Sequence, residues 1–169
     1  TGNYAARRPL RVMVAGIPNV GKSTLANTLA ARRRAGVGPK PGVTRQLQWI
    51  ALSGNIEILD TPGVIWPEIH DKIHELKLAL LGTIPDEQVG IELLAEFLWT
   101  LLHSQVAGVN WELYNCKECP QTPNEFIEAV AVRRGLFRAG GEVDTMRAAE
   151  AVVKDFRAGR LGRVTIDVP

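Results

Sequence analysis

The sequence lacks any apolar run that approaches the roughly 20 residues needed to span a bilayer, and it has no secretory signal. We therefore expect a cytoplasmic protein without a membrane partner. Hydrophobic residues nevertheless make up 46% of the 169 residues, which is enough for one or two small cores and excludes a disordered tail. Position 1 is threonine rather than methionine, so we expect a processed or truncated N-terminus.

Cysteine is also scarce. The only two, Cys116 and Cys119, stand in C-x-x-C spacing. A structural zinc site needs four ligands, and His70, His74 and His103 do not follow zinc-finger spacing. A redox pair would normally accompany a βαβ pattern, which is lacking there. We interpret the two cysteines as incidental thiols in a reducing cytosol.

Charge of one sign is missing from whole segments. Residues 1–56 contain nine Lys and Arg and no carboxylate, and residues 57–100 contain nine Asp and Glu against two lysines. Residues 133–163 turn basic again, with eight Lys and Arg against four acids. This layout favours contact with a polyanion at two places, and the alternative for each cluster is an ordinary solvated surface.

A phosphate-binding loop is present near the start of the chain. Residues 16–23 read GIPNVGKS and fit G-x-x-x-x-G-K-[ST] at every fixed position. An apolar run precedes the motif and a helical stretch follows it, which is the context the motif needs. Its glycines allow backbone N–H groups to point at phosphate oxygens, and Lys22 can reach the β- and γ-phosphates. The candidate nucleotide-binding residues are Asn19, Val20, Gly21, Lys22, Ser23, Thr24 and Gly63.

A second motif, Asp60-Thr61-Pro62-Gly63, begins 38 residues after Lys22, at the end of an apolar strand. Asp60 can hold Mg²⁺ through water opposite Ser23, and the Gly63 N–H can contact a γ-phosphate. Thr44, in the loop between the motifs, can bring a hydroxyl to Mg²⁺. The predicted Mg²⁺ ligands are Ser23, Thr44 and Asp60, and the predicted catalytic residues are Lys22 and Thr44. Order, spacing and strand context together predict a phosphate-loop NTPase.

Periodicity and the two motifs predict an α/β fold: a phosphate-loop NTPase domain with a mixed, mainly parallel sheet and flanking helices, then a small all-α domain. We place the domains at residues 1–84 and 85–169. Val12 and Val14 suit a strand buried in the sheet. The predicted strands are 10–16, 46–52 and 55–59, the latter two forming a hairpin, and the predicted helices are 23–34, 71–81, 86–102, 124–134 and 144–158, with Asn124 and Asp144 as caps.

The segments GIPNVGKST, KPGVTR and DTPGVIWP resemble the TRAFAC class of GTPases, and within it the circularly permuted ribosome-assembly GTPases of the YlqF/RbgA type. Residues 133–135 and 156–162 resemble that family's helical C-terminal domain. The resemblance implies a partial phosphate-loop GTPase fold, and hydrolysis of GTP to GDP and phosphate during late assembly of the large (50S) ribosomal subunit. The guanine-reading N-K-x-D is not found here. In the permuted family it precedes the phosphate loop, so guanine preference is implied by the resemblance alone.

Val64 follows the second motif, where Ras-like GTPases hold a water-orienting glutamine. Valine cannot hydrogen-bond water, so we expect slow intrinsic hydrolysis, and the resemblance implies that the ribosomal subunit is the activator. In related potassium-stimulated GTPases an asparagine at the position of Asn19 helps to bind K⁺. The alternative is that Asn19 only stabilises the loop turn.

The C-terminal helices carry basic residues that fit backbone-directed RNA binding, and the resemblance implies rRNA and the large ribosomal subunit as partners beside GTP and GDP. These residues are Arg133, Arg134, Arg138, Arg147, Lys154, Arg157, Arg160 and Arg163. Two other functions stay open. One is an ATPase or a GTPase of another role, such as ion transport or tRNA modification. The other is an RNA-binding module with a vestigial nucleotide site.

Overall fold

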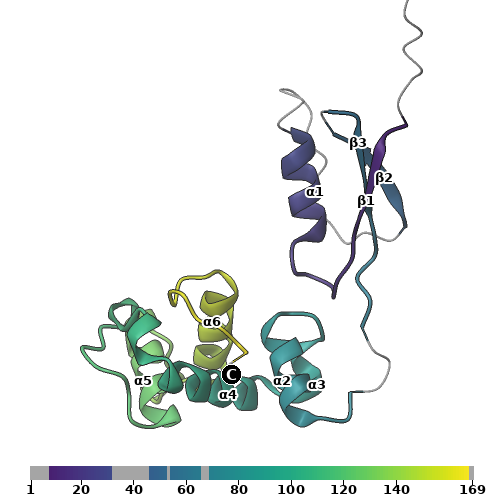
Figure 1. The fold of residues 1–169 in the computed structure, drawn as a ribbon. Helices are drawn as coiled ribbons and strands as arrows, with labels where there is room; N and C mark the ends of the chain where they lie inside the picture. The colour runs from purple at the N-terminus through teal and green to yellow at the C-terminus, as the bar shows by residue number, and fades with distance from the viewer. Residues whose placement is uncertain (1–7, 32–45, 53, 66–68, 168–169) are drawn as a thin grey trace, which may run out of the picture. The chain divides into compact units, whose positions relative to one another are not determined.

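The computed structural model describes residues 8–31, 46–52, 54–65 and 69–167. The chain forms two compact units, Thr1–Glu68 and Ile69–Pro169 (Figure 1). The units divide earlier in the chain than residues 84 and 85, where we expected a domain boundary. The reason is packing, because helix α2 (Lys72–Leu80) contacts the later helices of the second unit.

The first unit contains a mixed three-stranded sheet. Its strands are β1 (Leu10–Val14), β2 (Gln48–Ala51) and β3 (Ile56–Asp60), in the order β1-β3-β2. β1 runs parallel to β3, and β2 runs antiparallel to it. Gly54 and Asn55 both have positive φ angles, which suits the tight turn of the predicted hairpin. The expected mixed sheet is therefore confirmed.

Helix α1 (Lys22–Ala31) packs against β2 and β3, with Ala26 fully buried. The end of the predicted helix and the loop at residues 35–45 lie outside the described residues. β1 differs from the prediction, because Val12 is exposed and Val14 is only half-buried. In the described part of the unit, β1 forms an edge of the sheet, so its apolar side chains, including Leu10 and Met13, remain accessible to solvent.

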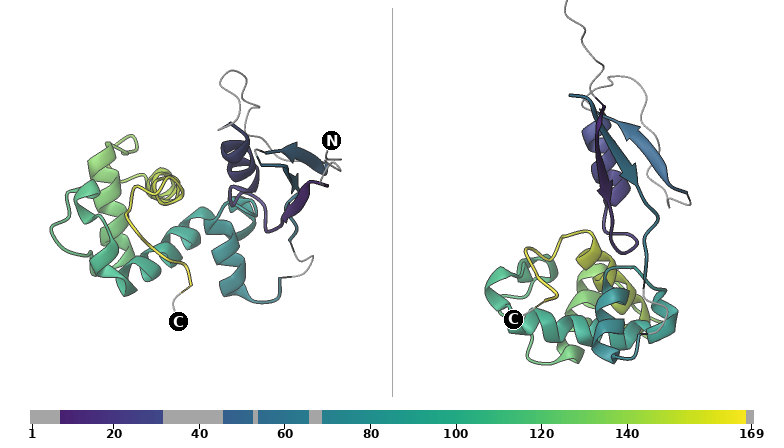
Figure 2. Two further views of the ribbon diagram at one scale, coloured as in Figure 1. Left: turned by 45° about the horizontal axis from the view of Figure 1, so that its top comes forward. Right: turned by 45° about the vertical axis from the view of Figure 1, so that its right-hand side comes forward.

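The second unit is all α-helical, as predicted. Besides α2 it contains α3 (Asp86–Val89), α4 (Ile91–Ser104), α5 (Pro123–Arg134) and α6 (Thr145–Arg157), with 3₁₀ turns at Val106–Gly108 and Trp111–Tyr114. α6, drawn in yellow, packs against α4 and α5 (Figure 2). Fully buried side chains from these helices form the core: Leu80, Leu94, Leu98, Leu102, Phe126, Val130, Val152 and Val153. Each contributes roughly 1.5–3 kcal/mol by leaving water.

Two predicted helix boundaries were wrong. The single helix expected at 86–102 is divided at Gly90, whose φ of 87° and ψ of 128° are not helical. α5 begins after Thr122 rather than at Asn124, because the Thr122 side chain accepts a hydrogen bond from the Glu125 N–H and proline occupies the first turn. The predicted Asp144 cap of α6 is confirmed, since its side chain accepts from the Arg147 N–H.

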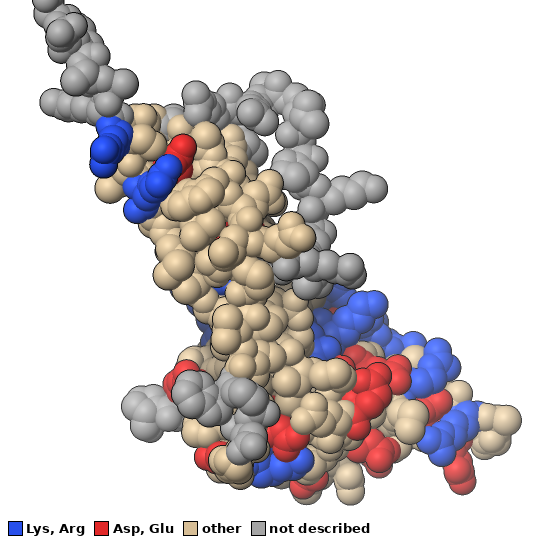
Figure 3. All heavy atoms as spheres, turned by 90° about the vertical axis from the view of Figure 1, so that its right-hand side faces the viewer, with Lys and Arg blue, Asp and Glu red and all other residues tan. Residues whose placement is uncertain are grey.

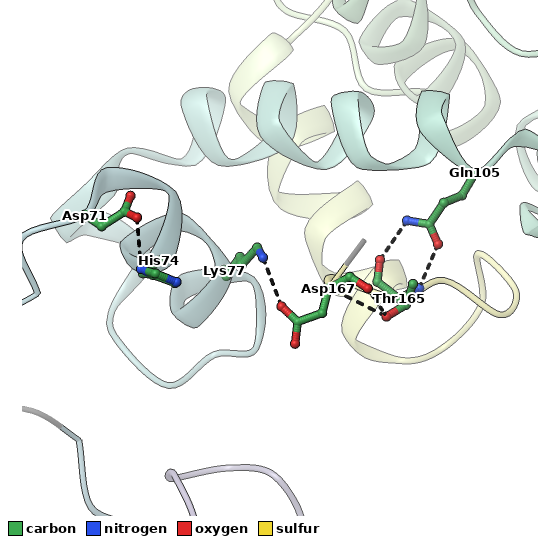
Figure 4. Close-up of polar contacts among 6 residues, drawn as sticks. All are labelled: Asp71, His74, Lys77, Gln105, Thr165 and Asp167. Atoms are coloured by element: carbon green, nitrogen blue, oxygen red, sulfur yellow. Dashed lines mark hydrogen bonds and ion pairs between the residues drawn. The ribbon is translucent and has the colours of Figure 1, made fainter. Parts of the chain in front are cut away.

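The C-terminal segment after α6 is tied to earlier helices by polar contacts (Figure 4). The Gln105 side chain donates to the Thr165 carbonyl at 2.7 Å and accepts from the Thr165 N–H at 3.0 Å. Lys77 on α2 forms an ion pair of 2.9 Å with Asp167. The segment thus connects the C-terminal end of α4 to α2.

No helix within the described residues has the length and apolar character that a membrane span requires.

Candidate functional site

The phosphate loop connects β1 to α1, as the motif requires. Gly21 has a φ of 89°, a conformation that side-chain-bearing residues rarely adopt, and it stands directly before the first residue of α1. The Leu25 N–H donates to the Gly21 carbonyl at 2.8 Å and so begins the helix within the motif. Backbone N–H groups at a helix N-terminus attract anions, so this geometry suits a phosphate.

Lys22 bends back over the loop from which it comes. Its ammonium donates a hydrogen bond of 2.7 Å to the carbonyl oxygen of Ile17. Lys22 and Ser23 are both half-buried, whereas Asn19, Val20 and Thr24 are exposed. The positive charge of Lys22 is therefore held at the phosphate loop.

The Asp60–Gly63 segment lies directly beside this loop. Val14 and Asp60 are the last paired residues of the parallel strands β1 and β3. Both motifs therefore follow the carboxyl ends of their strands, on the same side of the sheet. The Val64 N–H donates to the Gly16 carbonyl at 3.3 Å. A methyl group at Gly63 would lie 2.4 Å from the backbone nitrogen of Pro18, so only glycine allows this close approach.

One contact here was not anticipated from the sequence. The Thr61 hydroxyl donates a hydrogen bond of 2.7 Å to the carbonyl oxygen of Val14. The D-x-x-G pattern of the second motif leaves position 61 unspecified. Its place directly after the last residue of a strand was the signal, since a hydroxyl there can bond the neighbouring strand.

The predicted magnesium ligands are only in part within the described residues. Asp60 is 3% exposed, and Ser23 lies in the first turn of α1. The Asp60 carboxylate and the Ser23 hydroxyl offer oxygen ligands of the kind that Mg²⁺ prefers. A cation would also compensate the charge of the buried Asp60 carboxylate. The structure thus fits Mg²⁺ at these two residues. Thr44 lies outside the described residues.

The two cysteines are free thiols. The Cys119 sulfur lies 3.3 Å from Nδ1 of His103, whose ring stacks at 4.9 Å on Trp99. Burial raises the pKa of both thiols, which keeps them protonated and unreactive at neutral pH. Among the described residues, no group of three or more His, Cys, Asp and Glu could hold a metal ion.

Several of the predicted RNA-binding residues have internal partners. Arg134 and Arg160 pair with Asp155, and Arg157 pairs with Asp86. Positive and negative side chains lie interspersed on the visible face of the helical unit (Figure 3). Of the predicted RNA-binding residues, four are exposed and form no ion pair within the described part of the unit: Arg133, Arg147, Lys154 and Arg163.

Residues 11–105 match the family model of the 50S ribosome-binding GTPase. The chain is 40% identical to ribosome biogenesis GTPase A of Priestia megaterium over 96% of its own length and 56% of the relative's. It is 33% identical to the same-named protein of Thermotoga maritima, over 96% of its own length and 58% of the relative's. It is 36% identical to mitochondrial GTPase 1 of Aedes aegypti, over 98% of its own length and 57% of the relative's. The chain therefore spans little more than half the length of these relatives.

Two solved structures are similar to this chain as well. One is a GDP-bound structure of TM YlqF, with a TM-score of 0.69 and 30% identity, covering 96% of this chain and 62% of that one. The other is GNP-bound YlqF from T. maritima, with a TM-score of 0.66 and 29% identity, covering 93% and 58%. The fold expected from the motifs is confirmed by these matches.

Proposed function

Because the chain belongs to the 50S ribosome-binding GTPase family, we propose that it binds GTP at its phosphate loop and hydrolyses it to GDP and phosphate. In this proposal the activity serves late assembly of the large (50S) ribosomal subunit in the cytoplasm. The names of the relatives support a role in ribosome biogenesis, and the description of the family supports binding to the 50S ribosome. The observation that carries the proposal is the contact of the segment after β3 with the end of β1, through Thr61–Val14, and with the phosphate loop, through Val64–Gly16. A γ-phosphate bound at the carboxyl ends of β1 and β3 would contact both the phosphate loop and the segment after β3.

The residues of the site have different roles in phosphoryl transfer. This reaction needs positioning and charge neutralisation more than covalent chemistry. Lys22 and the N–H groups of residues 19–24 stabilise negative charge on the β- and γ-phosphates. Ser23, Thr44 and Asp60 would hold Mg²⁺, which would supply further neutralisation of negative charge. The Gly63 N–H contacts the γ-phosphate and so distinguishes GTP from GDP.

Positioning of the attacking water needs a group other than Val64. This side chain is aliphatic and 75% exposed, so it neither orients water nor shields the site. Hydrolysis is therefore slow until the ribosomal subunit completes the site. Comparison of the Val64→Ala variant with the wild type tests this point, and equal intrinsic rates are expected.

K⁺ is the second ion that we assign, with Asn19 as its ligand. Asn19 has a φ of 61°, which asparagine tolerates better than most residues, and this suits its alternative role in the loop turn. GTPase rates of the full-length protein in KCl and NaCl separate the two roles. Equal rates would leave Asn19 only the structural one.

The helical unit contacts rRNA through its exposed basic residues. Arg147 and Lys154 both lie on α6, seven residues apart and so on one side of the helix. Contacts to phosphates weaken as salt rises, so affinity for the large subunit should fall with salt. Replacing both residues by alanine should make the slope of the logarithm of affinity against the logarithm of salt concentration shallower, by the equivalent of about two phosphate contacts.

The test uses the full-length protein and purified large subunits. We expect hydrolysis that rises on addition of subunits, and displacement of bound GTP by GDP but not by ATP. Lys22→Ala should reduce the rate by roughly 10²-fold or more, whereas Lys72→Ala, which removes an exposed lysine paired with Glu75, should not. Displacement by ATP would indicate an ATPase. Subunit binding that responds to neither GTP analogues nor Lys22→Ala would indicate an RNA-binding module.

A further inference from the structure

We propose that Thr61 is a positioning residue that holds the segment after β3 against the phosphate loop, and that it thereby selects GTP over GDP. This role rests on the proposed function, because it concerns the binding of the γ-phosphate. It adds a residue outside the nucleotide-binding and metal-ligating sets predicted from the motifs. The Thr61 side chain contacts the protein backbone, so it acts through Gly63 rather than on the nucleotide itself.

The position of Thr61 follows from the register of the sheet. Val14 and Asp60 are the last paired residues of β1 and β3, so Thr61 is the first residue beyond the ladder. Its hydroxyl donates to the Val14 carbonyl at 2.7 Å, in a half-buried environment. The hydroxyl thus continues the connection between the two strands by one more residue, at the point where β1 leads into the phosphate loop and β3 into the second motif.

A second anchor lies three residues further along. The Val64 N–H donates to the Gly16 carbonyl at 3.3 Å, which is a longer and weaker bond. Pro62 and Gly63 form the short arch between these two anchors. Gly63 is so close to Pro18 that a single added methyl group would lie 2.4 Å from its backbone nitrogen. The arch is therefore held at one end by a bond to the last residue of β1 and at the other by a bond to the first residue of the phosphate loop.

Anchoring of this kind matters for one ligand group in particular. In the proposed function, the Gly63 N–H is the group of the arch that contacts the γ-phosphate. GDP lacks a γ-phosphate. Without the Thr61 hydroxyl, binding of GTP would have to order the arch, and that loss of conformational freedom would weaken binding. GDP is bound by the phosphate loop alone, so its affinity should change little.

The experiment compares Thr61→Val with Thr61→Ser in the full-length protein. Valine is close in shape to threonine but lacks the donor, whereas serine keeps the donor. Dissociation constants are measured with Mg²⁺ for GDP and for a non-hydrolysable GTP analogue. We expect Thr61→Val to weaken the analogue by about 3- to 10-fold, the usual effect of one hydrogen bond, and to change GDP affinity by less than about 2-fold. Thr61→Ser should restore the wild-type ratio.

Thr28→Val is the matched control. The Thr28 hydroxyl also donates to a backbone carbonyl, that of Thr24 at 2.8 Å, but on the exposed side of α1. This variant should bind both nucleotides like the wild type. Thermal melting of each variant, with and without GDP, reports whether the unit remains folded.

The outcomes separate this role from the proposed function. If the wild-type protein binds neither guanine nucleotide, the proposed function fails, and the positioning role fails with it. If the wild type binds both and Thr61→Val has the same affinity ratio, only the positioning role is overturned. Equal weakening of GDP and the analogue would also overturn it, because a merely structural contact would affect both nucleotides.

Discussion

The Tyr114 hydroxyl donates a hydrogen bond of 2.8 Å to Oδ2 of Asp155, a carboxylate that is only 1% exposed. Arg134 donates to the same oxygen, and Arg160 donates to Oδ1 at 2.9 Å. Asp155 thus connects α5, α6 and the 3₁₀ turn Trp111–Tyr114 inside the helical unit. A buried carboxylate without such donors would be strongly destabilising.

Tyr114→Phe should lower the free energy of unfolding of the helical unit by about 1–2 kcal/mol. The variant removes one donor to a buried charge and retains the aromatic packing of Tyr114 on Phe126. Urea denaturation measures the effect. Thr100→Val is the control, because its hydroxyl bonds the Glu96 carbonyl on an exposed helix surface. A loss for Tyr114→Phe no larger than that of the control would contradict the prediction.

Stability should fall as the pH falls below about 4. Burial raises the pKa of Asp155, but hydrogen bonds from Tyr114, Arg134 and Arg160 outweigh it and lower the pKa below its ordinary value. A lowered pKa in the folded state stabilises the protein above the unfolded pKa, and this stabilisation is lost as the pH falls through the folded pKa. Unfolding free energies of the wild type and Asp155→Asn, measured from pH 7 to pH 3, should therefore converge. Parallel curves would refute the prediction.

Arg157→Ala should destabilise the end of α2. The Arg157 guanidinium donates to the carbonyls of Ala79 at 2.7 Å and Leu80 at 3.1 Å, and it binds both carboxylate oxygens of Asp86. We expect a loss of about 1–3 kcal/mol and faster amide exchange in α2. Arg157→Lys should not restore stability, because one ammonium cannot replace the forked guanidinium. Arg147→Ala, at an exposed site on the same helix, is the control.

Gly63→Ala should prevent the segment after β3 from resting on the phosphate loop. The added methyl group would lie 2.4 Å from the Pro18 nitrogen and 2.5 Å from its Cα, and these backbone atoms cannot move aside independently. We expect binding of a GTP analogue to weaken by roughly 10-fold or more, measured by fluorescence titration. Gly54→Asn serves as the control, since space is open there and asparagine tolerates its positive φ. Unchanged analogue binding by Gly63→Ala would show that the close approach is dispensable.

Gln105→Ala should release the C-terminal segment from α4. The variant removes both hydrogen bonds to the Thr165 backbone, while the Lys77–Asp167 ion pair remains. We expect faster hydrogen exchange at the Thr165 amide with little change in overall stability, because the segment is exposed. The Asp71–His74 pair provides the comparison, since its loss in His74→Ala should leave the Thr165 amide unaffected.

Motifs with fixed chemistry could be predicted from the sequence. The phosphate loop, the strand before it and the helix after it are where GxxxxGKS requires them, and the β2–β3 hairpin follows from the turn residues Gly54 and Asn55. Helix ends were less predictable, because Gly90 interrupts the helical run through its backbone conformation, and Thr122 rather than Asn124 caps α5 with its side chain. The ligand roles of Asp60, Ser23 and Thr44 stay predictions.

By itself, the sequence was enough to predict which residues would bind phosphate and Mg²⁺, because those capacities belong to side chains and to short, local backbone turns. Only the tertiary structure decided which distant groups meet. The parallel pairing of β1 with β3 brings Thr61 to Val14 and Gly63 to Pro18, and the packing of α5 and α6 surrounds Asp155 with donors. Such contacts join residues far apart in the chain, and they depend on strand register and helix packing, which no local pattern specifies.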